Sequence, residues 1–298
     1  MTALPFRSSL ALLAGILAAG SLAAQPASAT FRPALLEAYS AGFSATARND
    51  LDRGGPAGRV AVARADLSFT GRTALSEATT VLHGLAWASN RLDLTGPVRL
   101  PDQLDEVTLS LGLQHRASPQ WSLGAYLRPG FYGDTLDTDG FNAPLLATAM
   151  YHASRDLSWI FGFSANAASD NPFIPIAGVR WQFAPEWTLN IGFPRAGIAW
   201  KSSEAVTWHL GATVQGGAYY VGEDFGAPTP ATGRLARTWL EYREIRTGLG
   251  AEVALSAGVT LAADIGVAVD QRFDYFDRGY KLKGETPLFL RLAIQGRF

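Results

Sequence analysis

Apolar and polar positions alternate with a period of two along most of this chain. From Leu288, every second residue is apolar or glycine as far as Phe298, and the residues between them include Arg291. The same alternation runs through 206–214 and 259–269. Because successive side chains of a strand point to opposite faces, these segments are predicted to be β-strands with one apolar and one polar face.

The residue types on the two faces indicate which solvent each face meets. The polar face is rich in Gly, Ser, Thr, Asn and Gln, whereas a water-soluble sandwich tends to place Lys and Glu there. The apolar face carries large aromatic residues, and Trp121, Trp159, Trp187 and Trp208 each follow a short turn. An apolar exterior, a polar lumen and aromatic girdles are typical of outer-membrane barrels.

The connections between these segments fall into two length classes. One set is tight: "ASPQ", "SRD", "APE", "KSSEA" and "SAG". The other set is longer and polar, and includes "RLDLTGPVRLPDQ", "GDTLDTDGFNAP" and "GEDFGAPTPATGR". Short turns on the periplasmic rim and long loops on the outer rim are the expected arrangement of a transmembrane barrel.

The sequence therefore predicts an all-β fold: a closed antiparallel up-and-down transmembrane β-barrel of about 14 strands. Twelve strands is the alternative, because the pair in 187–201 would be very short around Pro194. Both counts are even, as two periplasmic ends require. The expected strands are 35–48, 59–70, 77–90, 104–116, 120–133, 143–153, 157–168, 173–183, 187–193, 196–201, 205–221, 235–256, 259–272 and 286–298.

Closure of the sheet explains why the alternation continues to the final residue. An unpaired backbone N–H or C=O in lipid costs several kcal/mol, so an open sheet edge is not tolerated there. The last strand is therefore expected to pair with the first. Its alternating apolar residues and aromatic end resemble the C-terminal signal read by the barrel assembly machinery, carried by Leu290, Leu292, Ile294, Gly296 and Phe298.

The first 29 residues differ from the rest. One basic residue, Arg7, precedes an apolar run that ends in a small-x-small site, with Ala27 and Ala29 on either side of Ser28. This is the pattern of a secretory signal peptide (1–29), and it leaves one barrel domain (30–298). Removing Arg7 changes the formal charge from 25 − 26 to 24 − 26, so no nucleic-acid partner is expected. The chain has no Cys, which excludes disulfides and thiolate sites.

Several segments together resemble a known family. They are "LPDQLDEVTLSLGLQHR", "LNIGFPRAGIAW", "WLEYREIRTGLGAEVALSAGVTLAADIGVAVDQRFDYFDRG" and the closing strand, and the most specific part ends in Gln271, Arg272 and Phe273. They are similar to a family of uncharacterised proteobacterial outer-membrane β-barrels, classed as a domain of unknown function. The resemblance covers most of the mature chain. It implies the barrel fold and carries no activity.

Charged residues on the expected inner face are the main candidates for function. Besides His209, eight basic and four acidic residues fall there, which leans towards anionic or polar solutes. Two interpretations remain open: mutually satisfied ion pairs that stiffen the interior, or charged rings that select solutes. The candidates are Arg64, Asp66, Arg116, Arg128, Arg180, Lys201, His209, Arg246, Glu252, Asp264, Asp270, Arg291 and Arg297.

Signals for catalysis or metal binding are weak, so no enzymatic activity is expected. His152 and Ser154 have the two-residue spacing of a His–Ser pair on one strand, as in some outer-membrane lipases, but no third member is evident. The four His residues lack a second ligand at metal-site spacing. The loop "DTLDTDG" lacks the downstream Glu of a calcium loop. Neither a metal nor a cofactor is expected.

The sequence thus predicts a monomeric barrel in the outer membrane of a Gram-negative bacterium, in contact with outer-membrane lipid and lipopolysaccharide. The favoured function is a porin-like pore or facilitator for small polar or anionic solutes. The alternative is a non-conducting structural or surface-interaction barrel. An outer-membrane lipid hydrolase is the least favoured function.

Overall fold

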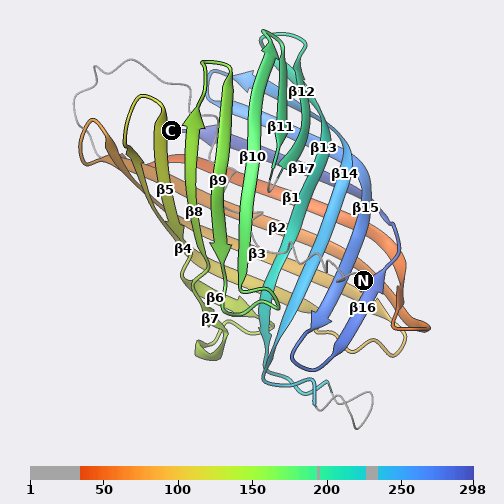
Figure 1. Cartoon of the computed structure of the whole chain (residues 1–298). Coiled ribbons are helices and arrows are strands. Elements are labelled where there is room, and N and C mark those ends of the chain that lie inside the picture. Colours follow the sequence, from red (N-terminus) through yellow and green to blue (C-terminus); the bar gives the residue numbers. More distant parts are fainter. Residues whose placement is uncertain (1–33, 193–194, 226–233) are drawn as a thin grey trace, which may run out of the picture.

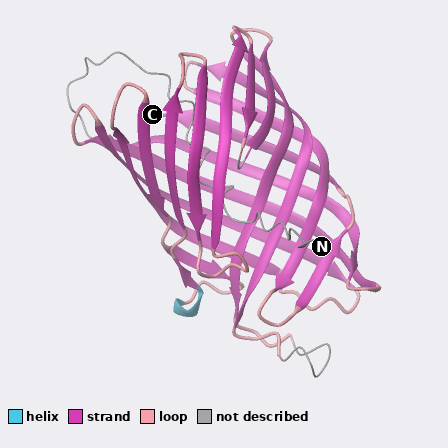
Figure 2. Cartoon of the chain, viewed as in Figure 1, coloured by secondary structure: helices cyan, strands magenta, loops and turns pink. Residues whose placement is uncertain are grey.

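The computed structural model describes residues 34–192, 195–225 and 234–298, so the expected signal peptide lies outside the described residues. No helix in the described ranges is long and apolar enough to cross a membrane. The described ranges form one sheet and a single 3-10 turn, η1 (Thr138–Gly140) (Figure 2). The strands are β1 (Ala34–Asp52), β2 (Pro56–Ala74), β3 (Thr79–Thr95), β4 (Gln103–Arg116), β5 (Trp121–Leu127), β6 (Gly130–Gly133), β7 (Phe141–Asn142), β8 (Leu145–His152), β9 (Leu157–Ala165), β10 (Phe173–Ala184), β11 (Trp187–Ile191), β12 (Arg195–Lys201), β13 (Val206–Val221), β14 (Thr238–Ser256), β15 (Val259–Tyr275), β16 (Tyr280–Gly284) and β17 (Leu288–Arg297).

The sheet closes on itself as an antiparallel barrel (Figure 1). The last strand pairs with the first, from Ala38 opposite Arg297 to Thr46 opposite Phe289. The wall around the short-turn rim consists of β1, β2, β3, β4, β5, β8, β9, β10, β11, β12, β13, β14, β15 and β17. The count of fourteen is confirmed, and twelve is excluded because the short strands β11 and β12 pair with each other and with their neighbours.

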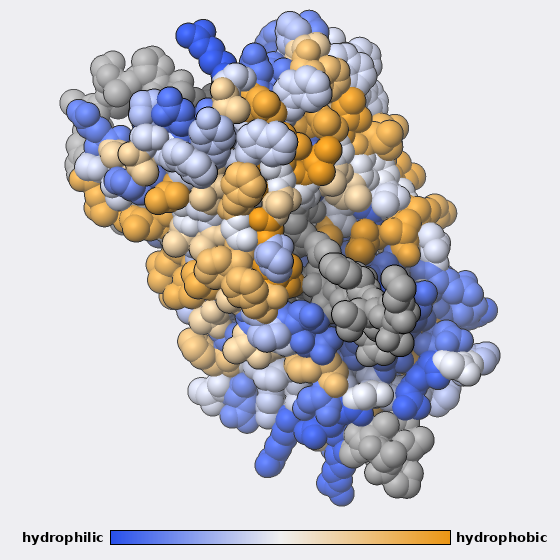
Figure 3. Space-filling view, viewed as in Figure 1, coloured by the Kyte–Doolittle hydropathy of each residue, from blue (hydrophilic) through white to orange (hydrophobic). Residues whose placement is uncertain are grey.

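The outer face of the wall is apolar, as the alternation predicts. Phe43, Leu111, Phe161 and Leu210 are among the large apolar side chains that are about half exposed. Figure 3 shows a band of hydrophobic (orange) surface over the face of the wall in view, whereas the end with the long loops is mainly hydrophilic. Exposed apolar surface on this scale is stable only against lipid.

Aromatic rings gather on this outer face close to the short turns. A series of rings runs across neighbouring strands, with Trp181 against Phe183, Phe183 against Trp187 and Trp187 against Trp200, at centroid distances of 5.6, 6.3 and 5.8 Å. Trp121 and Tyr151 make a similar contact at 5.1 Å. Rings in this position form the girdle that marks a membrane–water interface.

One β-bulge shifts the alternation in β15. Ala268 is opposite Arg246 on β14, but Asp270 is opposite Ile245, so one extra residue is inserted between them. The inner-face expectation for Asp270 is therefore wrong, because beyond the bulge the inner positions are Gln271 and Phe273 instead. Asp270 lies beside Arg272, whose Nε donates to Asp270 Oδ1 at 2.6 Å. A bulge reverses the facing of every later residue in a strand.

The wall narrows toward the long-loop end. On the long-loop side of the short strands, β6 stays paired with β4 and also pairs in parallel with β13 through Gly133 and Tyr220. At the same end, β16 joins β15 to β1. The ring that remains is β1, β2, β3, β4, β6, β13, β14, β15 and β16, which is nine strands. We call this ring the tip. We call β8 to β12, which end on the periplasmic side of the tip, the panel.

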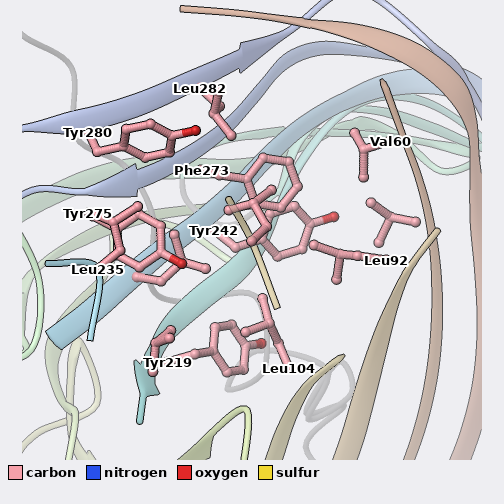
Figure 4. Packing of buried hydrophobic residues seen from close by; sticks show 14 of the residues in the cluster. Val60, Leu92, Leu104, Tyr219, Leu235, Tyr242, Phe273, Tyr275, Tyr280 and Leu282 are labelled. Carbon is pink, nitrogen blue, oxygen red and sulfur yellow. The ribbon is translucent and has the colours of Figure 1, made fainter. Parts of the chain in front are cut away.

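The inside of the tip is filled by its own side chains. Tyr219, Tyr242 and Phe273 are fully buried, and the rings of Tyr242 and Phe273 stack at 4.9 Å (Figure 4). The barrel therefore has a dry core at its outer end, since a ring of about eight strands is just narrow enough for side chains to fill. The cluster comprises Leu51, Val60, Val62, Leu92, Leu100, Leu104, Tyr132, Tyr219, Val221, Leu235, Leu240, Tyr242, Phe273, Tyr275, Tyr280 and Leu282.

Candidate functional site: the lumen and its seam

The charged residues expected on the inner face occupy inner-facing positions by strand register, Asp270 excepted. Seven of the twelve belong to three connected groups between the tip and the periplasmic rim, if Asp66 is counted with Arg64, whose Nε lies 3.9 Å from Asp66 Oδ1. The other five lie near the periplasmic rim. The inner-facing set is Arg64, Asp66, Arg116, Arg128, Arg180, Lys201, His209, Arg246, Glu252, Asp264, Arg291 and Arg297.

The first group is centred on Glu106 of β4. Arg64 of β2 donates to Glu106 at 2.9 Å and to Asn90 Oδ1 at 3.2 Å. Arg128 lies on the other side, with Nη2 3.9 Å from Glu106 Oε1 and 3.2 Å from Thr108 Oγ1. Alternation with Val107 could have placed Glu106 on the inner face, but its role as the acid between two arginines depends on the strand order.

The second group lies directly beneath the tip and is fully buried. Glu244 of β14 accepts hydrogen bonds from Arg246 Nε at 2.7 Å and from Gln271 Nε2 at 2.6 Å. Thr46 of β1 also donates to Glu244, at 3.2 Å, and the Arg246 guanidinium lies 5.0 Å from the Phe289 ring centroid. Glu244 was not among the sequence candidates; nothing in its local pattern marks it as the acceptor for three strands.

The third group lies lower in the lumen. His209 Nε2 is 2.6 Å from Asp264 Oδ1, and Arg291 Nη1 donates to Asp264 Oδ2 at 3.0 Å. Gly250, opposite His209 on β14, leaves the room for this contact, because a Cβ at that position would lie 2.2 Å from His209 Nε2. The carboxylate of Asp264 therefore has a partner on each oxygen.

Other lumen charges stand near the periplasmic rim and are exposed. Lys201 Nζ donates to Glu204 at 2.8 Å, and Glu252 Oε1 is 3.9 Å from Arg195 Nη1. Arg116 and Arg180 are exposed, and neither makes an ion pair with another described residue. Unpaired arginines inside a barrel are available to a solute, whereas paired ones first have to exchange partners.

The structure separates His152 from Ser154. The His152 ring lies between Ser122 Oγ, 3.2 Å from Nε2, and Ser158 Oγ, 3.0 Å from Nδ1. Ser154 lies in the following turn, where its hydroxyl accepts hydrogen bonds from the backbone N–H groups of Asp156 and Leu157. Ser154 therefore stabilises a turn and does not contact the imidazole.

The boundary between the tip and the panel forms a seam in the wall. A small cavity of about 20 Å³ opens there, between β13 on one side and the upper ends of β8 and β9 on the other. Arg128 Nε and Asn166 Nδ2 are buried and have no partner among the described residues. A cavity of this size can hold about one water molecule. Its lining comprises Glu106, Arg128, Tyr132, Asn142, Pro144, Asn166 and Gly216 to Ala218.

The loop between β9 and β10 (166–172) covers the seam from the outside. Asn142 Nδ2 donates to Asn166 Oδ1 at 2.8 Å, which holds the start of this loop. Ser169 Oγ and the backbone N–H of Asp170 both donate to Glu241 of β14, at 2.9 and 3.2 Å. We call this loop and its contact with Glu241 the latch, because it joins the panel to the tip without a strand pairing.

Nothing in the described ranges forms a cluster of three metal-ligating side chains. In the loop "DTLDTDG", Asp137 Oδ1 accepts hydrogen bonds from the backbone N–H groups of Asp139 and Gly140 and so caps η1. The Thr135 hydroxyl donates to its other oxygen at 2.7 Å and lowers the pKa of Asp137. This carboxylate is occupied by its own loop.

The fold is similar to solved outer-membrane proteins. The match to the COG4313 outer membrane channel from Pseudomonas putida F1 has a TM-score of 0.51 at 11% identity, and it covers 88% of this chain and 96% of that chain. The TodX monoaromatic hydrocarbon channel deltaS2 mutant gives 0.49 at 8% identity, covering 88% and 90% of the two chains. A Pseudomonas aeruginosa FadL homologue gives 0.44 at 10% identity, with the same coverage.

Sequence comparison assigns the family. No curated protein matches the chain in sequence. Residues 90–283, more than half of the chain, match the family model described as "Domain of unknown function (DUF6268)". The closed fourteen-stranded wall, the lipid-facing exterior and this match lead to one conclusion: the protein belongs to the DUF6268 family and is an outer-membrane β-barrel.

Proposed function

We propose that the protein is a passive channel for small polar solutes, with a preference for anions, whose route to the outside passes through the seam. The observation that carries the proposal is the fall from fourteen strands to nine. The nine-stranded tip closes the axial path with a dry core, and the panel ends on the periplasmic side of a polar cavity. The latch is then the element that separates the lumen from the exterior.

The charges support the solute class. Groups near the periplasmic rim include exposed Arg116, Arg180 and Lys201. The seam cavity is lined by Arg128, by Glu106, which is also paired with Arg64, and by amide side chains. A positive lumen raises the local concentration of anions and lowers that of cations. Apolar solutes are the competing class, because the protein of one similar structure is a monoaromatic hydrocarbon channel. That likeness is one of fold, and the lumen groups described above are polar.

A non-conducting barrel is the second candidate, and one observation favours it. The lumen charges of the three groups form ion pairs with one another: Arg64 with Glu106, Arg246 with Glu244, and Arg291 with Asp264. Buried ion pairs of this kind stiffen an interior without selecting any solute. Neither candidate requires catalysis, and we propose that the protein is not an enzyme.

A reversible cross-link across the latch tests the route. The chain has no Cys, so Ser169→Cys with Glu241→Cys gives two unique thiols. A bis-methanethiosulfonate reagent joins them and a reductant releases them. Single-channel current in planar bilayers is expected to fall to background on cross-linking and to return on reduction. The comparison lies within one variant, so loss of the native hydrogen bonds does not confuse it.

The matched control is Thr260→Cys with Gln295→Cys, direct partners on β15 and β17 far from the seam. Cross-linking these neighbours closes no opening, and their current is expected to stay unchanged. A current that survives the latch cross-link would exclude the seam as the route. Silence of the wild-type protein in the bilayer would exclude the channel and favour the non-conducting barrel. Steps that carry cations in preference to anions would contradict the solute class alone.

A further inference from the structure

Five inner-face residues form a row across five neighbouring strands near the periplasmic rim. Arg116 of β4 is the cross-strand partner of Ser122 of β5. On the other side, Ser158 of β9 is the partner of both His152 of β8 and Arg180 of β10. We call these residues, Arg116, Ser122, His152, Ser158 and Arg180, the arginine–serine row.

The hydrogen bonds of His152 leave a serine proton available at the lumen surface. Each ring nitrogen is bonded to one serine hydroxyl. A neutral imidazole has one donor nitrogen and one acceptor nitrogen, so one serine donates to the ring and the other accepts from it. The accepting serine keeps its own O–H free to donate elsewhere. The His152 ring therefore fixes the positions of two serine hydroxyls, and one of these hydroxyls can still donate a hydrogen bond to a solute.

The two arginines bracket this donor without a carboxylate between them. Both are exposed, and no described residue forms an ion pair with either. The adjacent inner-face positions on the same strands are uncharged: Gln114, Gly124, Met150, Ile160 and Gln182. The nearest acids are Glu77, Asp156 and Glu186, and all three lie outside the strands in the turns at the rim. Glu77 precedes Ala78, whose carbonyl accepts a hydrogen bond from the backbone N–H of Arg116. The row thus carries two basic side chains and no acidic side chain on the inner face of the barrel.

We propose that the arginine–serine row is a binding site for an oxyanion group, such as a phosphate, sulfonate or carboxylate, carried by a solute that enters from the periplasmic side. The guanidinium groups supply paired N–H donors that match an oxyanion, and the serine held by His152 supplies a neutral donor between them. The site deepens the proposed function by naming the solute group, and it rests on that function only in that solutes enter the lumen. Equilibrium binding requires no flux.

Binding of inorganic phosphate to the full-length protein in detergent tests the site. Isothermal titration at low ionic strength is expected to show saturable binding that Arg116→Ala and Arg180→Ala each weaken about tenfold, the loss typical of one charge-assisted hydrogen bond. The matched control is Arg72→Ala, which removes a periplasmic-end arginine already paired with Glu37 at 2.7 Å. That variant is expected to keep the wild-type affinity.

Two further measurements keep the outcome decisive. A gel-mobility shift between unheated and heated samples shows that each variant forms the barrel, and Ser158→Ala, which keeps both arginines, is expected to weaken binding less than either arginine variant. Equal affinity in all variants, or no saturable binding to the wild type, would overturn the site. A channel that conducts without binding phosphate would refute the site and leave the proposed function standing. Saturable phosphate binding to a barrel that carries no current would support the site and refute the proposed channel function.

Discussion

At the scale of single residues, glycines decide where two elements can approach each other. Gly296 lies under the Tyr39 ring, which would be 2.3 Å from an added Cβ, and this lets the ring of Phe298 reach Tyr39 at 5.4 Å. Gly216 is the most constrained of them. It has a φ of +131°, and a Cβ there would lie 2.0 Å from the carbonyl oxygen of Tyr242.

Gly216→Ala is therefore expected to destabilise the barrel by about 1–3 kcal/mol, because both the backbone conformation and the contact with a neighbouring backbone oppose a side chain. The adjacent Gly217→Ala is the control, since its Cβ would meet only the Tyr219 ring at 3.3 Å and its φ is ordinary. The temperature at which the folded gel band disappears measures both variants. Equal temperatures for the two would contradict the account.

The residue scale also shows what a sequence can and cannot reveal. The alternation places Arg64 and Asp264 correctly on the inner face, because period-two facing is a local property. It places Asp270 wrongly, because the bulge is visible only in the pairing of β14 with β15. Glu106 pairs with Arg64 of β2. Glu244 is bonded by Thr46 of β1 and Gln271 of β15 as well as by Arg246 of its own strand. The contacts between strands follow from the closed ring and from no local pattern.

At the scale of elements, unequal strand lengths produce the seam. β14 has 19 residues, whereas β11 has 5 and β12 has 7, so the panel ends well below the tip. The sequence indicates these short strands through Pro194, which itself lies outside the described residues. The break between β5 and β6 at Pro129 was not expected, since 120–133 reads as one strand. Because β8 pairs with β5 rather than with β6, β6 is free to bridge β4 to β13, and this bridge closes the tip beyond the end of the panel.

Glu241→Ala tests the latch as an element. Removing the carboxylate leaves Ser169 and the Asp170 N–H without their acceptor, so loop 166–172 is expected to open more often. Protease nicking within 166–172 and single-channel current should both rise. Asp137→Ala, which removes an acid that caps another loop at the same end, serves as the comparison and should leave 166–172 intact. Identical nicking in wild type and Glu241→Ala would show that the loop is held by other contacts.

At the scale of the whole molecule, the barrel is a funnel. The fourteen-stranded part faces lipid on its outside and carries charge inside, whereas the nine-stranded tip has an apolar interior and a hydrophilic exterior (Figure 3). The sequence predicts the first part, where the rule of dry outside and wet inside holds. The sequence does not predict the tip, because there the same alternation places apolar side chains inside the barrel and polar side chains outside.

A substitution in the tip is expected to change the stability of the barrel without changing its channel current. Tyr219→Ala removes a fully buried ring that also accepts a hydrogen bond from Asn90 at 3.1 Å, and it is expected to lower stability by about 3–5 kcal/mol. The same variant should leave the current unchanged at temperatures where it stays folded, because the proposed route passes through the seam and not along the barrel axis. Chemical denaturation and bilayer recording measure the two effects. A variant that gains current would show that the tip itself is the gate.

The tip has a consequence for how the cell is seen from outside. A phage, an antibody or a neighbouring cell that approaches this protein meets, in the part of the chain that the structure describes, a polar knob whose interior is packed with side chains. On the proposed route through the seam, a binder on the summit does not obstruct passage, and a reagent that blocks the proposed channel has to reach down the flank to the surface of the bilayer.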